Sequence, residues 1–236
     1  MQHVIKGSVL PVLEMELSPG EKLIAETGEL AWMTDNISMR TAITGISGNA
    51  GQRGLMGAVK RAISGGSLFM TEYSNAANAP GLIVFASKFP GTIMPIELSH
   101  GQSYLVHRHG FVCGTEGVQL EMAVQRSMGS GFLGRVGFLL QRVSGPGTAF
   151  IELSGELTQY DLDPGERLLI HPGHVGMLEP SVGYDVVTVP GLKNKFFSGD
   201  GLFLLSLTGP GKIWLQSTTI ANLAHALIPY MPAGSE

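Results

Sequence analysis

The chain has 236 residues, of which only 14% are charged and 33 are glycine. Glycine at about double its usual share of ~7%, combined with so few charges, predicts short strands joined by tight turns. The formal net charge of −4 argues against nonspecific nucleic-acid binding, which depends on a positive field.

The cysteine content and the chain start bear on location. Cys113 is the only cysteine, so no disulfide forms within the chain, and we expect it to be a small buried hydrophobe. The opening residues, MQHVIKGSVL, lack the long apolar core of a secretion signal, and no stretch approaches the ~18 apolar residues of a membrane span. These features predict a cytoplasmic protein.

One phrase occurs three times along the chain. It reads LSPGEKLIAETGE from Leu17, LSHGQSYLVHRHG from Leu98 and LDPGERLLIHPGH from Leu162. A glycine followed by Glu or Gln, between two apolar runs, predicts a strand, a tight turn and a second strand. The predicted turn glycines are Gly20, Gly101 and Gly165.

A second pattern predicts a hairpin after each copy of the phrase. Two apolar runs flank NAANAPG at 75–81, SGPG at 144–147 and TGPG at 208–211. The hairpin glycines of the two short versions are Gly145, Gly147, Gly209 and Gly211.

The two patterns divide the chain into three tandem β repeats, at residues 1–90, 91–154 and 155–216. One such unit of five or six strands is too small to bury much apolar surface, so we expect the three to pack together. A closed set leaves no repeat uncapped. This favours an all-β fold of three sandwich-like repeats around a pseudo-threefold axis; an open solenoid is the alternative.

Two segments depart from the threefold pattern. The first repeat carries an insertion at 45–66, and a tail follows the third repeat at 217–236. Within the tail, STTIANLAHALIPYMP predicts a C-terminal helix that begins after a cap at 217–219 and ends at Pro229. We expect this helix to cover a sheet edge or an oligomer seam. The low charge and high apolar content also predict a homo-oligomer.

The GGSLF stretch at 65–69, the tripled turn and the GPG hairpins resemble the bacterial and archaeal members of the altered-inheritance-of-mitochondria 24 family. The resemblance runs from Met1 to about Gln216. It implies a fold similar to that of the tryptophan RNA-binding attenuation protein, a β-sandwich unit that is tripled here. Mitochondrial relatives are associated with inner-membrane organisation. The resemblance brings no catalytic residues to this chain.

Four histidines are candidate metal ligands. They are His107 and His109 in the second copy of the phrase and His171 and His174 in the third. If the repeats meet at a common axis, these imidazoles could converge and bind Zn²⁺. The first copy has Glu26 and Thr27 in that stretch, and no recognisable ligand spacing accompanies the histidines. We therefore expect solvated or turn-bonded histidines, no bound metal and no other cofactor.

Within the insertion, residues 53–63 (RGLMGAVKRAI) predict a short basic amphipathic helix. Such a helix can lie on an anionic membrane or dock on a protein partner. The alternative, favoured by its short length, is a lid packed on its own sandwich. The apolar face would comprise Leu55, Met56, Val59 and Ile63, with Arg53, Lys60 and Arg61 beside it.

Two further patterns have a structural interpretation. GSGFLG at 129–134 matches the dinucleotide fingerprint, but the following RVGFLLQRV reads as a strand rather than the helix that the fingerprint needs. The scattered aromatics Trp32, Tyr104, Tyr160 and Trp214 are expected to pack in the core, because single-strand nucleic-acid binding needs aromatics interleaved with basic residues.

We therefore expect a non-enzymatic scaffold or binding protein that forms a homo-oligomer and acts on a protein partner or an anionic membrane surface. Nucleic acid is disfavoured by the charge. The alternative function is a small-ligand or RNA binder of the attenuation-protein type, and a third is a metal-dependent enzyme. Fold analogy alone suggests the alternative, which makes it weaker.

Overall fold

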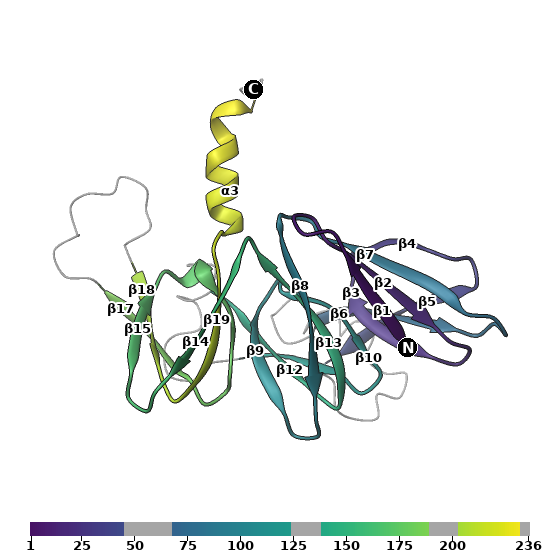
Figure 1. The fold of residues 1–236 in the computed structure, drawn as a ribbon, viewed down its shortest axis with the longest axis horizontal. Coiled ribbons are helices and arrows are strands. Elements are labelled where there is room, and N and C mark those ends of the chain that lie inside the picture. The colour runs from purple at the N-terminus through teal and green to yellow at the C-terminus, as the bar shows by residue number, and fades with distance from the viewer. Residues whose placement is uncertain (45–67, 124–137, 189–202, 232–236) are drawn as a thin grey trace, which may run out of the picture.

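Figure 1 shows the computed structural model, which describes residues 1–44, 68–123, 138–188 and 203–231. Within these residues the chain consists of antiparallel strands in sheets of four, six, six and three strands, and it ends in a short helix. The predicted all-β fold with a C-terminal helix is confirmed.

The strands of the N-terminal part pair in two ladders, each with one central strand and a neighbour on either side. β2 pairs with β7, which also pairs with β4, while β3 pairs with β6, which also pairs with β5. β1 (Gln2–Lys6) lies beside β2 at the edge of its sheet. The bounds are β2 (Val12–Leu17), β3 (Lys22–Glu26), β4 (Leu30–Met33), β5 (Ile37–Thr44), β6 (Leu68–Asn75) and β7 (Gly81–Ala86).

The same pattern of pairs occurs twice more along the chain. We name the groups β2–β7, β8–β13 and β14–β19 the first, second and third unit. The second contains β8 (Gly91–Leu98), β9 (Ser103–His107), β10 (Phe111–Thr115), β11 (Gln119–Met122), β12 (Leu140–Ser144) and β13 (Gly147–Ser154). The third contains β14 (Leu157–Leu162), β15 (Arg167–Ile170), β16 (Val175–Leu178), β17 (Gly183–Thr188), β18 (Phe203–Thr208) and β19 (Gly211–Gln216).

A register shift occurs at the same place in each unit, in the third strand of the unit, where this strand pairs with the last one. A β-bulge bends its strand and re-aims the side chains that follow. Its recurrence at matching positions indicates that the three units follow a common backbone path. The shifts lie between Leu30 and Trp32, between Phe111 and Cys113, and between Val175 and Met177.

Consecutive units are joined by main-chain pairing. β10 of the second unit pairs with β3 of the first, and β16 of the third pairs with β9 of the second. Among the described residues, this leaves β4 and β15 with one neighbour each. They lie at opposite ends of the longest axis in Figure 1. Within the described residues β4 and β15 do not pair with each other, so the strand pairing does not join the three units into the closed set that we expected. The pseudo-threefold axis stays a prediction.

The buried clusters of apolar side chains cross the boundaries between units. One joins the first unit to Cys113 and Phe150 of the second, and another joins the second unit to Met177 and Trp214 of the third. A third cluster combines the third unit with Leu105 of the second. Cys113 is fully buried, which confirms its predicted role as a small core residue. Each unit thus completes its core with residues of its neighbour.

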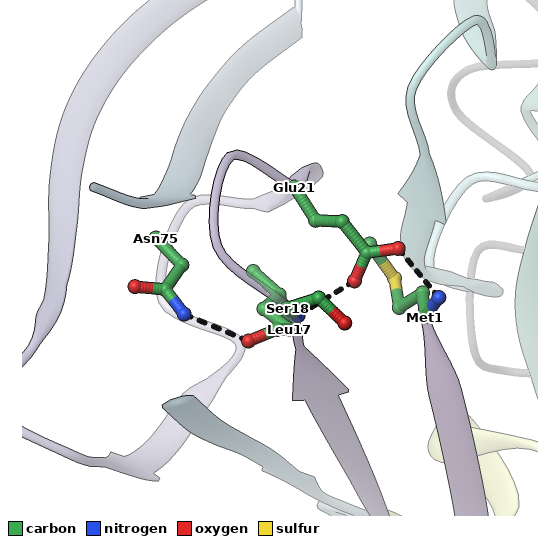
Figure 2. Close-up of polar contacts among 5 residues, drawn as sticks. All are labelled: Met1, Leu17, Ser18, Glu21 and Asn75. Atoms are coloured by element: carbon green, nitrogen blue, oxygen red, sulfur yellow. Dashed lines mark hydrogen bonds and ion pairs between the residues drawn. The ribbon is translucent and has the colours of Figure 1, made fainter. Parts of the chain in front are cut away.

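The repeated phrase forms a turn with a side-chain brace. Gly20 has φ of 84°, and the Glu21 backbone N–H donates to the Ser18 carbonyl at 3.1 Å, as in a type II turn. Figure 2 shows that Glu21 Oε2 also accepts from the Ser18 N–H at 2.7 Å, while the Met1 amino group lies 2.5 Å from Oε1. The buried Asn75 side chain donates to the Leu17 carbonyl beside this turn.

The other two copies of the phrase repeat this brace. Gly101 and Gly165 have φ of 78° and 82°. The side chain that follows each glycine accepts a hydrogen bond from the backbone N–H three residues before it, as Glu21 does. The bonds are Ser99 N to Gln102 Oε1 at 3.1 Å and Asp163 N to Glu166 Oε2 at 2.9 Å. The Glu or Gln of the phrase thus has a structural role in each turn.

The C-terminal helix, α3 (Ile220–Leu227), is capped by Thr219, whose hydroxyl accepts from the Asn222 N–H, and it is followed by η2 (Ile228–Tyr230). None of the α3 residues is buried, and the helix projects from the sheets in Figure 1. The expectation that this helix covers a sheet edge of its own chain is therefore wrong. A place at an oligomer seam stays a prediction. No helix in the described part of the chain has the length and apolar character needed to cross a membrane.

The aromatic side chains divide into two pairs. Trp214 is buried and meets Tyr104 edge-on, with ring centroids 5.6 Å apart, so core packing is correct for this pair. Trp32 and Tyr160 are about half exposed. The prediction of core packing is wrong for these two, because they lie on the edge strands β4 and β14.

Candidate functional site

The turn between the second and third strands of each unit brings titratable side chains to one edge of the sheets. In each turn the backbone N–H of the fourth residue donates a hydrogen bond to the backbone carbonyl of the first residue, with N···O distances of 2.8–3.2 Å. Because β10 lies beside β3 and β16 lies beside β9, consecutive turns are neighbours. The first residues of the three turns are Glu26, His107 and His171.

A cavity of about 630 Å³ opens along these turns. All three first residues line it, and so does His109 of the second turn. The other walls come from the loop after β7, the ends of β13 and β19, and the first residues of α3. Cavities of about 300–1,000 Å³ are typical of small-molecule sites. This cavity is therefore the candidate functional site.

Three carboxylates and one ammonium line the cavity. Glu29 is 10% exposed and forms an ion pair with Lys88, which is half exposed. Burial, together with repulsion from Glu29, raises the pKa of Glu26 to about 7, although Lys88 and Arg108 lower it in part. With all the carboxylates ionised, these four groups sum to a net charge of −2, from three negative charges and one positive charge.

Glu152 is the third carboxylate, and burial also raises its pKa. Its Oε1 atom is buried and has no hydrogen-bond partner among the described residues. The nearby Ser87 hydroxyl and the Lys88 backbone N–H lower the pKa in part. A buried carboxylate oxygen without a donor is costly, so this group favours either a proton or a cation that enters the cavity.

Gln216 occupies the position in the third unit that Glu152 occupies in the second, five residues after a glycine with φ of 138°. Its amide uses both ends: Nε2 donates to the Gly173 carbonyl at 2.8 Å, and Oε1 accepts from the Ser154 N–H at 3.0 Å. An amide at this position supplies both the donor and the acceptor that the neighbouring backbone needs. A carboxyl group in the same place supplies a donor only when it is protonated.

The histidines are partly brought together. His107, His109 and His171 line the cavity, and the ring centroids of His107 and His109 are 5.8 Å apart. His107 is the last residue of β9, and His109 lies in the turn that follows this strand. Burial lowers the pKa of His109 and of His171, so both imidazoles are neutral at pH 7. His174, in the short helix η1 (Pro172–His174), instead bonds the Gln216 carbonyl through Nδ1 at 2.8 Å.

The side chains do not form a ready metal centre. Across the described ranges, no group of three or more His, Cys, Asp or Glu side chains is placed to hold a metal ion. The expectation that the protein binds no metal stays a prediction, which elemental analysis can test.

Other predicted site residues lie outside the described residues. These are the whole insertion at 45–66, with the candidate docking residues Arg53, Leu55, Met56, Val59, Lys60, Arg61 and Ile63. The GSGFLG stretch at 129–134, for which we expect a structural role, also lies outside the described residues. The hairpin glycines are described. Gly147 and Gly211 both have φ of 138°, and the peptide bonds from Gly145 to Pro146 and from Gly209 to Pro210 are cis.

Reasoning from the sequence missed the carboxylates of the cavity. A signal for Glu26 was present, because it stands in the first copy of the phrase where His107 and His171 stand in the others. The absence of a histidine from that copy speaks against a metal site built of imidazoles, but it does not speak against a site that uses a carboxylate. Glu152 and Lys88 gave no such signal, since they belong to the ends of other strands and loops that only folding brings to these turns.

Comparisons with known proteins place the chain in a family. A family model described as mitochondrial biogenesis AIM24 matches residues 3–218. An uncharacterized protein of Streptococcus pyogenes serotype M6 is 27% identical over 237 residues, which cover all of this chain and 93% of that protein. A crystal structure of a Streptococcus pyogenes protein is similar in fold, with a TM-score of 0.73 and 24% identity over 98% of this chain and 99% of the other. Because the family model spans nearly the whole sequence, the chain belongs to the mitochondrial biogenesis AIM24 family.

Proposed function

We propose that the protein is a non-enzymatic binding protein, and that its ligand is a small organic cation held in the cavity along the turns. One observation carries the proposal: Glu26, Glu29 and Glu152 share a cavity wall with a single ammonium group, that of Lys88. Burial and mutual repulsion raise the pKa of Glu26 and of Glu152. An amine or guanidinium group in the cavity would offset both effects.

The remaining walls suit such a ligand. The neutral imidazoles of His109 and His171 each offer an acceptor nitrogen to an N–H donor. The Oε1 atom of Glu152 is a buried acceptor that no described residue satisfies. A ligand with two or more N–H groups could therefore bond to several walls at once.

The charge of the cavity weighs against the alternative of an RNA ligand, because carboxylates repel phosphates. The likeness to the tryptophan RNA-binding attenuation protein stays a prediction, as do a cytoplasmic location and a scaffold role at a membrane or on a protein partner.

Isothermal titration calorimetry with spermidine and with argininamide tests the proposal. We expect at least one of them to bind at pH 7.5 and to bind more weakly at pH 5.5, where Glu26 is protonated. At pH 7 binding should release protons, because a cation lowers the Glu26 pKa; buffers of different ionisation enthalpy measure this release.

A pair of double variants provides the control. Glu26→Gln/Glu152→Gln removes two carboxylates from the cavity and should abolish binding. Glu16→Gln/Glu121→Gln removes two exposed carboxylates on β2 and β11, with the same change in net charge, and should leave binding intact. Absence of binding by the wild type, or equal loss in both double variants, would refute an organic-cation site.

A further inference from the structure

Two strands at opposite ends of the molecule lack a partner that their counterparts have. β10 and β16 each pair with the second strand of the unit before them, whereas β4, the corresponding strand of the first unit, has only β7 as a neighbour among the described strands. β3 and β9 each pair with a strand of the unit after them, whereas β15, the corresponding strand of the third unit, has only β18 as a neighbour in the described part of the chain. Within the described residues both strands are sheet edges, with main-chain groups open to pairing.

The pairing inside the chain fixes the register that β4 and β15 would adopt with each other. Cys113 lies opposite Ala25 where the first two units meet, and Met177 lies opposite Val106 where the next two meet. The recurring bulge places Trp32 at the position of Cys113 and Met177. Counted from the turn glycines, the counterparts of Ala25 and Val106 include one residue of β15, which is Ile170.

Exposure at these positions changes with pairing. Cys113 and Met177 are 0% and 1% exposed, but Trp32, their counterpart on the unpaired β4, is 50% exposed. A tryptophan at a position that is fully buried in both other units indicates a surface that another strand covers.

The other edge shows the same contrast. Leu105 on β9 pairs with Leu178 of the next unit and is 4% exposed. Its counterpart Leu169 on the unpaired β15 is 56% exposed. The matching residue of β4 is Met33, which is already half buried. On one face of the ladder an exposed Trp32 would thus meet the buried Ile170, and on the other face an exposed Leu169 would meet Met33.

We propose that β4 of one copy of this chain pairs antiparallel with β15 of a second copy, and thereby continues the ladder that joins the units within each chain. The register sets Trp32 opposite Ile170 and Met33 opposite Leu169. Two positions beyond Met33, the same register sets Asp35 opposite the exposed Arg167, and these two side chains carry opposite charges. The contact is head-to-tail, because two different edges meet; it therefore builds a ring or an open filament.

A single chain does not satisfy both edges in the structure, since β4 and β15 lie at opposite ends of its longest axis (Figure 1). A second copy of this chain is the partner that fits each edge, because every copy already carries both β4 and β15. Their pairing agrees with the position of the bulge, with the register between the units and with the exposed apolar side chains. This inference is independent of the ligand proposed for the cavity.

Sedimentation of three variants with the same chemical change tests the contact. We expect the wild type at 100 µM to sediment well above the 25.0 kDa of one chain. Trp32→Glu and Leu169→Glu should each reduce the mass to one chain. Met39→Glu alters an equally exposed side chain on β5, outside the contact, and should leave the assembly unchanged. A monomeric wild type, or assembly retained by both edge variants, overturns the proposal.

An equimolar mixture of the two edge variants tests whether the contact is head-to-tail or symmetric. Trp32→Glu chains keep an intact β15, and Leu169→Glu chains keep an intact β4, so the mixture should form one interface and stop at two chains, about 50 kDa. A symmetric interface would be broken in both partners and could not recover on mixing. A mixture that stays monomeric therefore overturns the head-to-tail contact.

Disulfide trapping tests the register without weakening the contact. Directly opposed residues in an antiparallel pair have Cα atoms about 4.5–5.5 Å apart, within the range that a disulfide spans. Under mild oxidation, Met33→Cys chains mixed with Leu169→Cys chains should form a covalent dimer. Arg167→Cys, two positions away, should trap far less. A chain that carries both Met33→Cys and Leu169→Cys should form a ladder of covalent oligomers; a bond closed within one chain would overturn the proposal.

Discussion

Glu26 and His109 line the same cavity, and burial shifts their pKa values in opposite directions: it raises that of Glu26 to about 7 and lowers that of His109. Both shifts favour the uncharged form, as expected when a charge is moved away from water. Near pH 7 the cavity therefore holds a neutral imidazole and a carboxyl close to its titration midpoint. Proton uptake at Glu26 links the state of the cavity to physiological pH.

The Glu26 shift predicts a pH dependence of stability. The folded pKa of about 7 lies above the unfolded value of 4.5, so the contribution of this group to the free energy of unfolding is full below pH 4.5 and is lost as pH rises to 7. After allowance for its partial exposure, we expect a loss of about 1–2 kcal/mol. Urea denaturation of ligand-free protein from pH 4.5 to 8 measures it.

Glu26→Gln should flatten that profile and be more stable than the wild type at pH 8. Glu16→Gln, which removes an exposed carboxylate on β2, should follow the wild-type curve. Parallel profiles for the wild type and Glu26→Gln would contradict the raised pKa.

The matching positions of Glu152 and Gln216 predict opposite effects of reciprocal substitutions. Glu152→Gln supplies the amide that Gln216 uses in the third unit, and it should raise the free energy of unfolding at pH 8 by about 1 kcal/mol. Gln216→Glu places a carboxylate oxygen against the Gly173 carbonyl and should cost about 1–3 kcal/mol. Gln119→Glu, an exposed substitution on β11, is the charge control. Two effects of equal sign would show that the positions are not equivalent.

The turn glycines predict a cost set by backbone conformation alone. Gly165 has φ of 82°, and a Cβ there meets no atom within 4 Å, so Gly165→Ala should cost about 1–2 kcal/mol through φ only. Gly165→Asn should cost less, since Asn tolerates this region better. By contrast, a Cβ on Gly209 would lie 2.4 Å from the Asp163 carbonyl oxygen, so Gly209→Ala should cost clearly more. Thermal denaturation ranks the three variants.

We expect the purified protein to carry no stoichiometric transition metal, because the described His, Glu and Asp side chains do not gather into a set of three or more ligands. Elemental analysis by inductively coupled plasma mass spectrometry checks this. About one zinc per chain, lost in His107→Ala, would reverse the expectation and make the imidazoles of the cavity metal ligands.

The sequence determined the local structure and the class of fold. The phrase at Leu17, Leu98 and Leu162 encodes its own turn, because the glycine at its centre and the Glu or Gln after it act on backbone groups only three residues away. Alternating apolar runs then specify strands, and a capping threonine begins the last helix. Interactions of such short range can be read along the chain without knowledge of the rest of the fold.

Only the tertiary structure decided which strands stayed at the edges and which side chains met in the cavity. Trp32 resembles any core aromatic in the sequence, and it is exposed because the strand that carries it, β4, pairs with no other unit within the described residues. Glu152 and Glu26 are 126 positions apart and share a wall because β13 and β3 flank β10 in one sheet. Pairing between strands that are distant in sequence depends on the packing of the whole chain, so local pattern does not specify it.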